Sequence, residues 1–186
     1  MNGRNLMIRP AEADDVAAIA AIYGYHVLNG VASFEEVPPA ADEIDRRRRD
    51  ILDRGLPYLV AERNSRVVGY CYAGPYRTRS AYRFTLEDSI YVDAGEIRSG
   101  VGRVLLTELI ERCGGLGYRQ MIAVIGGRDQ WPSIRLHEAL GFVHVGLLPA
   151  VGFKFGDWVD TVLMQRALSP GAATLPGESA EARRRE

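Results

Sequence analysis

The amino-acid sequence predicts a single domain of the mixed α/β (α+β) class, with a central mixed sheet and helices on both of its faces. Its 186 residues are enough for one domain of ordinary size, but they leave no room for two. Along the chain, segments with the apolar alternation of strands follow segments with the apolar spacing of helices. No internal repeat and no linker-like change of composition divides these segments, so we expect them to form one unit.

The composition disfavours several classes of protein. Lys and Arg together number 23 and Asp and Glu 24, a net charge of -1, whereas a general nucleic-acid or anionic-membrane binder would carry a basic excess. No run of 18 apolar residues occurs, and the first ten residues lack the apolar core of a secretory signal. Cys71 and Cys113 are too few and too isolated for a metal site or a disulfide framework. We therefore expect a soluble, cytoplasmic protein without a metal and without nucleic-acid or membrane partners.

The first half of the chain contains two helical patterns and four strand patterns. Either Asp14 or Asp15 can cap the first helix, which ends near Gly30. The second helix contains the run Arg46 to Arg49, but acidic residues four positions earlier indicate a salt-bridged solvent face rather than a phosphate site. The predicted elements of this half are a strand over 6–9, helices over 16–30 and 41–54, and strands over 58–62, 67–73 and 84–93.

The second half continues this alternation of helices and strands. From Gly102 to Cys113 the apolar residues follow helical spacing, and a glycine pair ends that helix. A later short helix ends at Gly141. The predicted elements of this half are helices over 102–113 and 132–140 and strands over 121–125, 142–148 and 157–166. The end of the chain is small, polar and charged, so we expect a folded domain over 1–168 and a disordered tail over 169–186.

The most informative segment is a glycine loop that follows the long strand predicted over 84–93. The strand ends in Ile90-Tyr91-Val92-Asp93, and the loop Arg98-Ser99-Gly100-Val101-Gly102-Arg103 opens the next helix. A strand, a glycine loop and a helix N-terminus in this order present backbone N–H groups and the positive end of the helix dipole to an anion. The loop lacks the Gly-Lys-Ser/Thr of a Walker motif and the third glycine of a dinucleotide fingerprint. It therefore predicts a phosphate-binding site of another type.

This loop resembles the pyrophosphate loop of the GNAT superfamily of acetyl-CoA-dependent N-acetyltransferases, which reads Gln/Arg-x-x-Gly-x-Gly/Ala. Ile97 stands where that family usually has Gln or Arg, and Arg98 follows it. Further stretches are similar to the phosphinothricin or methionine sulfoximine N-acetyltransferase branch. These stretches are Ala32 to Glu35, Tyr72 to Tyr82, Glu87 to Val92, Ala123 to Gly126, Ser133 to Phe142 and Gly152 to Lys154. Together with the loop, they extend the resemblance over nearly the whole domain.

The resemblance implies a fold, a reaction and a cosubstrate. The GNAT fold has a mostly antiparallel sheet with a splayed fourth strand, and its enzymes use acetyl-CoA and no metal. The branch acetylates the α-amine of a small amino acid or analogue, such as phosphinothricin or methionine sulfoximine, and it implies a homodimer. The residues expected to bind the cofactor are Ile90, Tyr91, Val92, Arg98, Ser99, Gly100, Val101, Gly102, Arg103, Gln130 and Ser133.

Acetyl transfer to an amine needs a base for the ammonium, a donor for the oxyanion and a proton for the departing thiolate. Glu87 lies where the resemblance places the catalytic base, and we expect Asp88 to be structural because only one carboxylate is needed. His137 stands where many GNAT enzymes have a tyrosine that protonates the coenzyme A thiolate, and an imidazole could serve there. The expected oxyanion donor is a backbone N–H near Ile90.

Substrate recognition is expected in the turn before the long strand, where two cations and a phenol can hold a carboxylate and a second anionic or polar group. The residues that the resemblance assigns to the substrate are Phe34, Glu35, Arg77, Arg79, Tyr82 and Val124. Phe155 stands where a histidine appears in antibiotic-resistance members, so phosphinothricin itself is expected to be a poor substrate.

Two other functions stay open at this point. One is a GNAT enzyme that acts on a protein N-terminus or a polyamine. A polyamine enzyme would need an acidic pocket, which Arg77 and Arg79 disfavour. The other is an acyl-CoA sensor that binds the ligand without turning it over, and a measurement of turnover would distinguish it.

Overall fold

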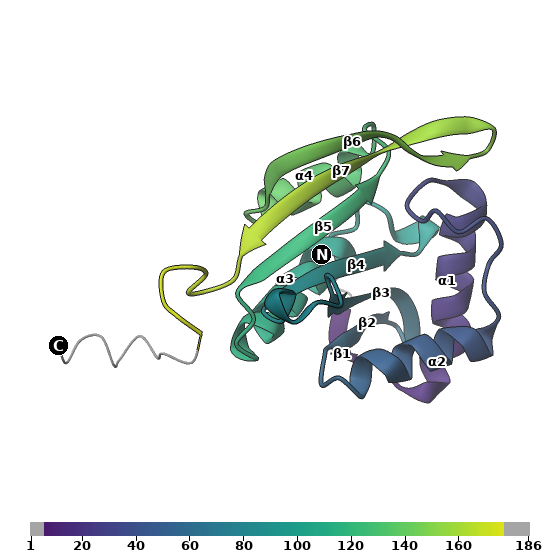
Figure 1. Ribbon diagram of the computed structural model, residues 1–186. Helices are drawn as coiled ribbons and strands as arrows, with labels where there is room; N and C mark the ends of the chain where they lie inside the picture. Colours follow the sequence, from purple (N-terminus) through teal and green to yellow (C-terminus); the bar gives the residue numbers. More distant parts are fainter. Residues whose placement is uncertain (1–5, 177–186) are drawn as a thin grey trace.

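The computed structural model describes residues 6–176, and its strands form one sheet (Figure 1). Within these residues the sheet has seven strands in the order β1-β2-β3-β4-β5-β7-β6. The strands are β1 Leu6–Pro10, β2 Tyr58–Arg63, β3 Arg66–Pro75, β4 Thr85–Val92, β5 Gln120–Gly126, β6 Val143–Lys154 and β7 Asp157–Ala167. Neighbouring strands are antiparallel except β4 and β5, which are parallel. The predicted mixed, mostly antiparallel sheet is confirmed.

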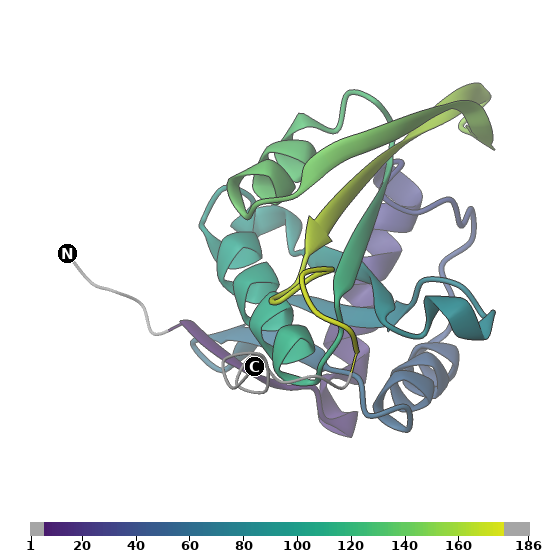
Figure 2. The same cartoon turned by 60° about the vertical axis from the view of Figure 1, so that its left-hand side comes forward.

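Helices cover both faces of this sheet, as Figure 1 shows and Figure 2 shows from the side. They are α1 Val16–Asn29, α2 Ala41–Leu52, α3 Val101–Gly115 and α4 Trp131–Ala139, with short 3₁₀ turns at Ala13–Asp15, Ser80–Tyr82 and Ala94–Glu96. One core cluster joins α3 and α4 to the sheet through Leu105, Leu109 and Ile134. The other cluster joins α1 and α2 to the opposite face through Ile19 and Ile44. The predicted helices on both faces are therefore confirmed.

The central strands are apolar on both faces because each face meets a layer of helices. In β2, Tyr58 and Val60 belong to the cluster around α1, whereas Leu59 and Ala61 belong to the cluster around α3. Such strands appear in the sequence as continuous apolar runs rather than as alternating ones. None of the helices within residues 6–176 is long and apolar enough to cross a membrane.

The arginine-rich helix α2 has the predicted ion pairs along its exposed side. Arg46 contacts Glu43 three residues earlier and Asp50 four residues later, each at 2.7 Å. Arg48 differs from the expectation, because it is buried and its Nη1 donates to the carbonyl oxygen of Ala11 at 3.1 Å. The run of arginines therefore serves packing between α2 and β1 as well as the solvent face.

The sheet opens between β4 and β5. Only the first half of β4, Thr85 to Asp88, pairs with β5, and its partners there are Gln120 to Ala123. Beyond that point β4 continues to Val92, while β5 stays paired with β7 as far as Gly126. Figure 1 shows the two strands diverging. The splayed fourth strand implied by the resemblance is confirmed.

The predicted end of a strand at residue 148 is wrong, because β6 continues to Lys154. Its register against β7 shifts twice, between His144 and Gly146 and between Leu148 and Gly152. At the second shift Ala150 has a positive φ of 53°, and its N–H donates to the Asp160 carboxylate at 2.8 Å. Proline and glycine near this point usually end a strand, so the sequence indicated a turn where the structure has a bulge.

Residues that follow β7 lie against Arg119. Its guanidinium donates to the carbonyl oxygens of Gly171 and Leu175 and to the hydroxyl of Thr174. The later part of the expected tail, residues 177–186, lies outside the described residues. The division of the chain into a domain over 1–168 and a tail therefore stays a prediction.

Candidate active site

A cavity of about 360 Å³ lies where β4 and β5 separate. Its walls come from β4, β5, the start of α4 and the segment between α1 and α2. Eight of the residues predicted for the site line it, namely Phe34, Glu87, Ile90, Tyr91, Val124, Gln130, Ser133 and His137. The splay thus brings predicted catalytic, cofactor and substrate residues to one place.

The backbone of β4 is open toward this cavity. Asp93 N–H donates to the Val68 carbonyl oxygen at 2.9 Å, and in the same register Tyr91 faces Tyr70. In an antiparallel ladder the mutually bonded pairs alternate with pairs whose N–H and C=O groups point away. The N–H and C=O of Ile90 therefore point away from β3, toward the side from which β5 has departed. A ligand in the cavity can reach these groups.

Glu87 lies half-buried on the cavity wall. The register between β3 and β4 is continuous, so Leu86 and Asp88 share the face toward α3 and Glu87 takes the opposite face. Burial and the charge of Asp88 raise the pKa of Glu87 above its ordinary value, and the charge of Arg77 opposes them. A carboxylate with a raised pKa accepts a proton more readily, which suits a general base.

Asp88 is bonded to His137, a contact that the sequence did not predict. His137 Nε2 lies 3.1 Å from Asp88 Oδ2, and its Nδ1 lies 2.8 Å from the Ser133 carbonyl oxygen. Both side chains are 2% exposed, and the Phe142 ring packs perpendicular to the imidazole. Burial alone would lower the pKa of His137, but the hydrogen bond and charge of Asp88 and the bond to Ser133 raise it above its ordinary value.

One signal in the sequence could have found this pair. Strand alternation places Asp88 with Leu86 and Ile90, on the face that packs against a helix. A carboxylate on such a face needs a partner, because burying an unpaired charge is costly. His137 lies on a largely apolar helix, and it is that partner.

Lys154 fixes the segment between α1 and α2 that forms one wall of the cavity. It is the only lysine in the sequence and is 2% exposed. Its ammonium donates to the carbonyl oxygens of Gly30 at 2.8 Å and Ser33 at 2.6 Å. Burial lowers its pKa, which the charges of Glu36 and Glu35 oppose. The wall segment is therefore tied to β6.

Phe34 projects from this wall segment against two glycines. A Cβ built on Gly126 would lie 2.7 Å from the Phe34 ring, and one on Gly152 would lie 2.4 Å from it. Real side chains do not approach so closely, so both positions require glycine. The neighbouring Val124 is 41% exposed and lines the same cavity. Phe34 and Val124, which the resemblance assigns to the substrate, thus both lie on the cavity wall.

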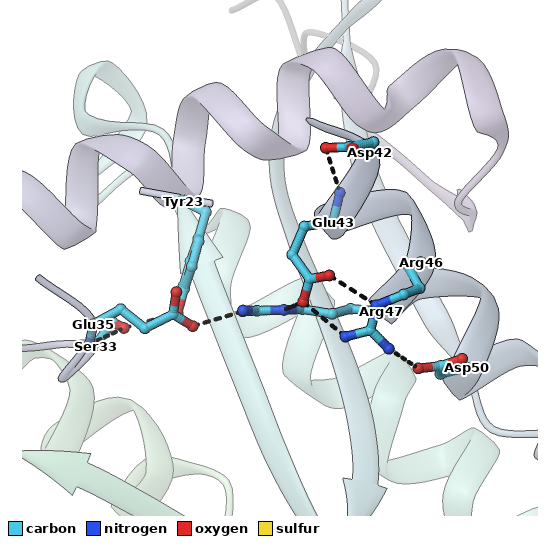
Figure 3. Close-up of polar contacts among 8 residues, drawn as sticks. All are labelled: Tyr23, Ser33, Glu35, Asp42, Glu43, Arg46, Arg47 and Asp50. Carbon is cyan, nitrogen blue, oxygen red and sulfur yellow. Dashed lines mark hydrogen bonds and ion pairs between the residues drawn. The ribbon is translucent and has the colours of Figure 1, made fainter. Parts of the chain in front are cut away.

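Glu35 is turned toward α2 and does not line the cavity (Figure 3). Arg47 Nη1 donates to its Oε1 at 2.6 Å, and the Tyr23 hydroxyl lies 3.0 Å from the same oxygen. Ser33 Oγ bonds to the Tyr23 hydroxyl at 2.7 Å, and Glu43 holds Arg47 from the other side at 2.7 Å. This network fastens the wall segment to both helices.

The glycine loop has the geometry of an anion site. Gly100 precedes the first residue of α3 and has a φ of 87°. Arg98 has a φ of 65°, and residues other than glycine rarely adopt such a positive φ. No side chain caps the N-terminus of this 15-residue helix. Gly102 has a different role, since a Cβ there would lie 3.2 Å from the Leu136 side chain of α4. The free N–H groups at Gly100 and beyond fit a phosphate.

The predicted substrate cluster before β4 is exposed and does not line the cavity. Arg77 stacks on the Tyr76 ring at 4.6 Å, and Arg79 and Tyr82 lie on the surface nearby. Only the charge of Arg77 reaches the site, through its effect on Glu87. The structure therefore places this cluster on the surface, outside the cavity.

The predicted cofactor residues Ser133 and Val92 both have carbonyl oxygens that are already bonded to a histidine. Ser133 lines the cavity, but its carbonyl oxygen is bonded to His137. Val92 does not line it, and its carbonyl oxygen is 2.8 Å from His26 Nε2 of α1. Among residues 6–176, no group of three His, Cys, Asp or Glu side chains could hold a metal ion.

The fold and the site together define an acetyltransferase of the GNAT type. Residues 21–142 match the model of the "Acetyltransferase (GNAT) family", and the chain belongs to this family. The family predicted from the sequence is therefore confirmed.

Three individual proteins show which members of the family this chain is similar to. The chain is 56% identical over 169 residues to a phosphinothricin N-acetyltransferase of Alcaligenes faecalis, a match covering 91% of this chain and 86% of the relative. It is 38% identical over 173 residues to an L-methionine sulfoximine/L-methionine sulfone acetyltransferase of Salmonella typhimurium, a match that covers 90% of this chain and 98% of the relative. A crystal structure of a Sinorhizobium meliloti phosphinothricin acetyltransferase with acetyl-CoA superposes with a TM-score of 0.90 at 50% identity, covering 94% of both chains. The predicted branch is confirmed.

Proposed function

We propose that this protein transfers an acetyl group from acetyl-CoA to the α-amine of a small amino acid or analogue of the phosphinothricin or methionine sulfoximine type. The observation that carries the proposal is Glu87, a carboxylate of raised pKa on the wall of the cavity between the splayed strands. The named activities of the similar proteins support the same substrate class.

Acetyl-CoA supplies the acetyl group, and the open backbone fits it in two places. The N–H groups of Gly100 to Arg103 at the start of α3 would hold the pyrophosphate, with the side chains of Arg98 and Arg103 exposed beside them. The outward groups of Ile90 would receive the amide-bearing arm, which leads the thioester into the cavity. The acetyl-CoA in the similar Sinorhizobium meliloti structure supports this cosubstrate.

Catalysis would divide between side chains and the backbone. Glu87 removes a proton from the substrate ammonium, because only the neutral amine can attack the thioester carbon. The N–H of Ile90 stabilises the oxyanion that develops on the acetyl oxygen. His137 supplies the proton that the departing coenzyme A sulfur needs.

The substrate would enter past the exposed cluster before β4. Arg77 and Arg79 attract a molecule that carries a carboxylate and a second anionic or polar group. Inside the cavity, Phe34 and Val124 would contact its side chain. Phe155 is exposed directly after β6, where a histidine is usual in resistance members, so methionine sulfoximine is the better candidate of the two analogues.

A thiol-release assay tests the proposal. Purified protein would be given acetyl-CoA with methionine sulfoximine, methionine sulfone, phosphinothricin, spermidine and a short peptide with a free N-terminus. We expect turnover with methionine sulfoximine and methionine sulfone to be at least 100-fold above that with spermidine or the peptide, on the order of what one correctly placed ion pair and its geometry provide. Phosphinothricin should be a poorer substrate than methionine sulfoximine. Preference for the peptide or spermidine would favour the other amine classes. Tight acetyl-CoA binding without turnover would favour a sensor.

The cellular setting follows from the same proposal. We place the enzyme in the cytoplasm as a homodimer, where acetylation would block the action of a toxic amino-acid analogue and give resistance to it. Support for the dimer comes from the edge strand β6, whose apolar side chains are exposed.

A further inference from the structure

Both ring nitrogens of His137 face oxygen atoms. The carbonyl oxygen of Ser133, 2.8 Å from Nδ1, can only accept a hydrogen bond, so Nδ1 carries a proton. Nε2 lies 3.1 Å from Asp88 Oδ2, and that bond needs one further proton between the two atoms. Asp88 and His137 therefore share a proton that a neutral histidine next to a carboxylate would lack.

A purely structural role leaves one atom of this pair unexplained. Asp88 Oδ1 is buried and has no hydrogen-bond partner among the described residues. Leaving a buried carboxylate oxygen unpaired is costly. Both Asp88 and His137 also line the cavity, although each side chain is only 2% exposed. The pair is thus a polar group presented to the site at the expense of stability.

The groups that face the pair from neighbouring elements do not take its proton. Burial and the charge of Asp88 raise the pKa of Cys113 on α3 to about 12, and they raise the pKa of Cys71 on β3 well above its ordinary value. Both thiols therefore stay protonated at neutral pH. Glu87 is the remaining titratable neighbour, on the opposite face of β4. The shared proton is governed by Asp88 and His137.

We propose that Asp88 is a positioning residue that keeps His137 protonated for the coenzyme A leaving group. This inference rests on the proposed acetyl transfer. When the thioester C–S bond breaks, the sulfur keeps the bonding electrons and takes the proton that the pair shares. The new C–N bond forms at the same carbon, and the nitrogen loses two protons in all. Glu87 accepts the first of these protons, and the second restores the pair.

Asp88→Asn tests the inference, because the amide keeps the shape of the side chain but removes its charge. On the alkaline side, wild-type activity should be lost as pH rises through the raised pKa of His137. In the variant both effects of Asp88 are lost, and only burial and the weaker opposing effect of the bond to Ser133 remain, so the alkaline limb of kcat should move at least one pH unit lower. At pH 8 kcat should fall by about 10- to 100-fold, whereas KM for acetyl-CoA should change less than about threefold.

Asp15→Asn is the matched control. Asp15 is a buried carboxylate bonded to Arg9, and it does not line the cavity. This control should lose stability without moving the alkaline limb. A wild-type alkaline limb retained by Asp88→Asn would overturn the inference, and so would an equal shift of that limb in both variants.

Histidine NMR gives a readout that does not depend on turnover. The chain has three histidines, so His137 can be assigned from the signal that is missing in His137→Gln. In the wild type it should titrate above the ordinary histidine range, and in Asp88→Asn below it. A wild-type His137 that titrates at or below that range would overturn the inference even if the variant does not fold. If His137 titrates as expected but no amine is acetylated, the proposed function is overturned, while the effect of Asp88 on the protonation of His137 still stands.

Discussion

At the scale of single residues, the site separates two adjacent carboxylates by strand alternation. Glu87 and Asp88 follow each other in β4, but Glu87 is half-buried on the cavity wall while the Asp88 side chain is 2% exposed and bonded to His137. An accessible carboxylate can exchange protons with a substrate, whereas a bonded one holds its partner in place. The two residues are therefore suited to different tasks despite their identical chemistry.

Glu87→Gln should reduce turnover without affecting acetyl-CoA binding. The amide has nearly the same shape but cannot accept the ammonium proton, so kcat at pH 7 should fall on the order of 100-fold. The wild-type rate should fall as pH drops through the raised pKa of Glu87. The pH–rate profile of the variant should lack this acidic limb. Above about pH 9 the free amino acid is a neutral amine, so the gap between the two proteins should narrow.

Rate measurements over pH 6 to about 10, with acetyl-CoA affinity from calorimetry, check this expectation. Glu111→Gln is a suitable control, because Glu111 is exposed on α3. A Glu87→Gln protein with full activity at pH 7 would show that this carboxylate is structural and that Asp88, Glu35 or water alone removes the proton.

Lys154→Met should weaken the wall of the cavity. Methionine retains the length of the side chain but loses the two bonds to Gly30 and Ser33. Two carbonyl oxygens then lose their donor, at a cost of about 1–3 kcal/mol in the free energy of unfolding. Because Phe34 lies on this segment, KM for the amine should rise about tenfold, while KM for acetyl-CoA should stay within about threefold. Steady-state kinetics with both substrates varied would expose an equal rise in both, which would contradict this role.

At the scale of secondary-structure elements, the N-terminus of α3 is the cofactor end of the site. Gly100→Val should raise KM for acetyl-CoA at least tenfold with a smaller effect on kcat at saturation. A Cβ at this position meets no atom within 4 Å, so the side chain would project into the space where a phosphate approaches. The positive φ of 87° adds strain.

Gly117→Val separates these two effects. Gly117 follows α3 with φ of 88°, and a Cβ at this position would also meet no atom within 4 Å, so the strain is the same at the opposite end of the helix. Its thermal stability should fall like that of Gly100→Val, but its KM for acetyl-CoA should not change. Equal KM values in the two variants would remove the cofactor site from the loop.

Elements that depend on local periodicity could be predicted from the sequence. The spacing of Leu105, Leu106 and Leu109 places α3 correctly, because a helix buries residues three and four apart. Contacts between distant residues could not be derived in this way. Asp88 and His137 are 49 positions apart, so strand alternation shows that Asp88 needs a buried partner but does not identify the partner. Lys154 and Gly30 are 124 positions apart and leave no local pattern at all. The splay of β4 came from the resemblance, since the apolar runs of β4 and β5 do not show where their pairing ends.

At the scale of the whole molecule, exposed apolar side chains gather on the β6–β7 hairpin. β6 is one of the two edge strands of the sheet among the described residues, and Figure 1 shows the hairpin extending past the helices. The side chains of this surface that are at least 43% exposed are Val143, Val145, Leu147, Leu148, Val151, Phe153, Phe155 and Trp158. A long, apolar edge strand is a template for pairing with a second chain. This surface is where we place the dimer contact.

If the proposed dimer forms through this surface, Val145→Arg combined with Leu147→Arg should convert it to a monomer, because two charges would be buried without partners in the contact. Sedimentation velocity at micromolar concentration would detect the change. The amine KM should rise with dissociation, since Gly152 and Lys154 on the same strand hold the cavity wall. Val37→Arg is the control, because Val37 is 77% exposed in the segment between α1 and α2 and does not belong to the hairpin. A wild type that sediments as a monomer, or a double variant that stays dimeric, would place the dimer contact elsewhere or remove it.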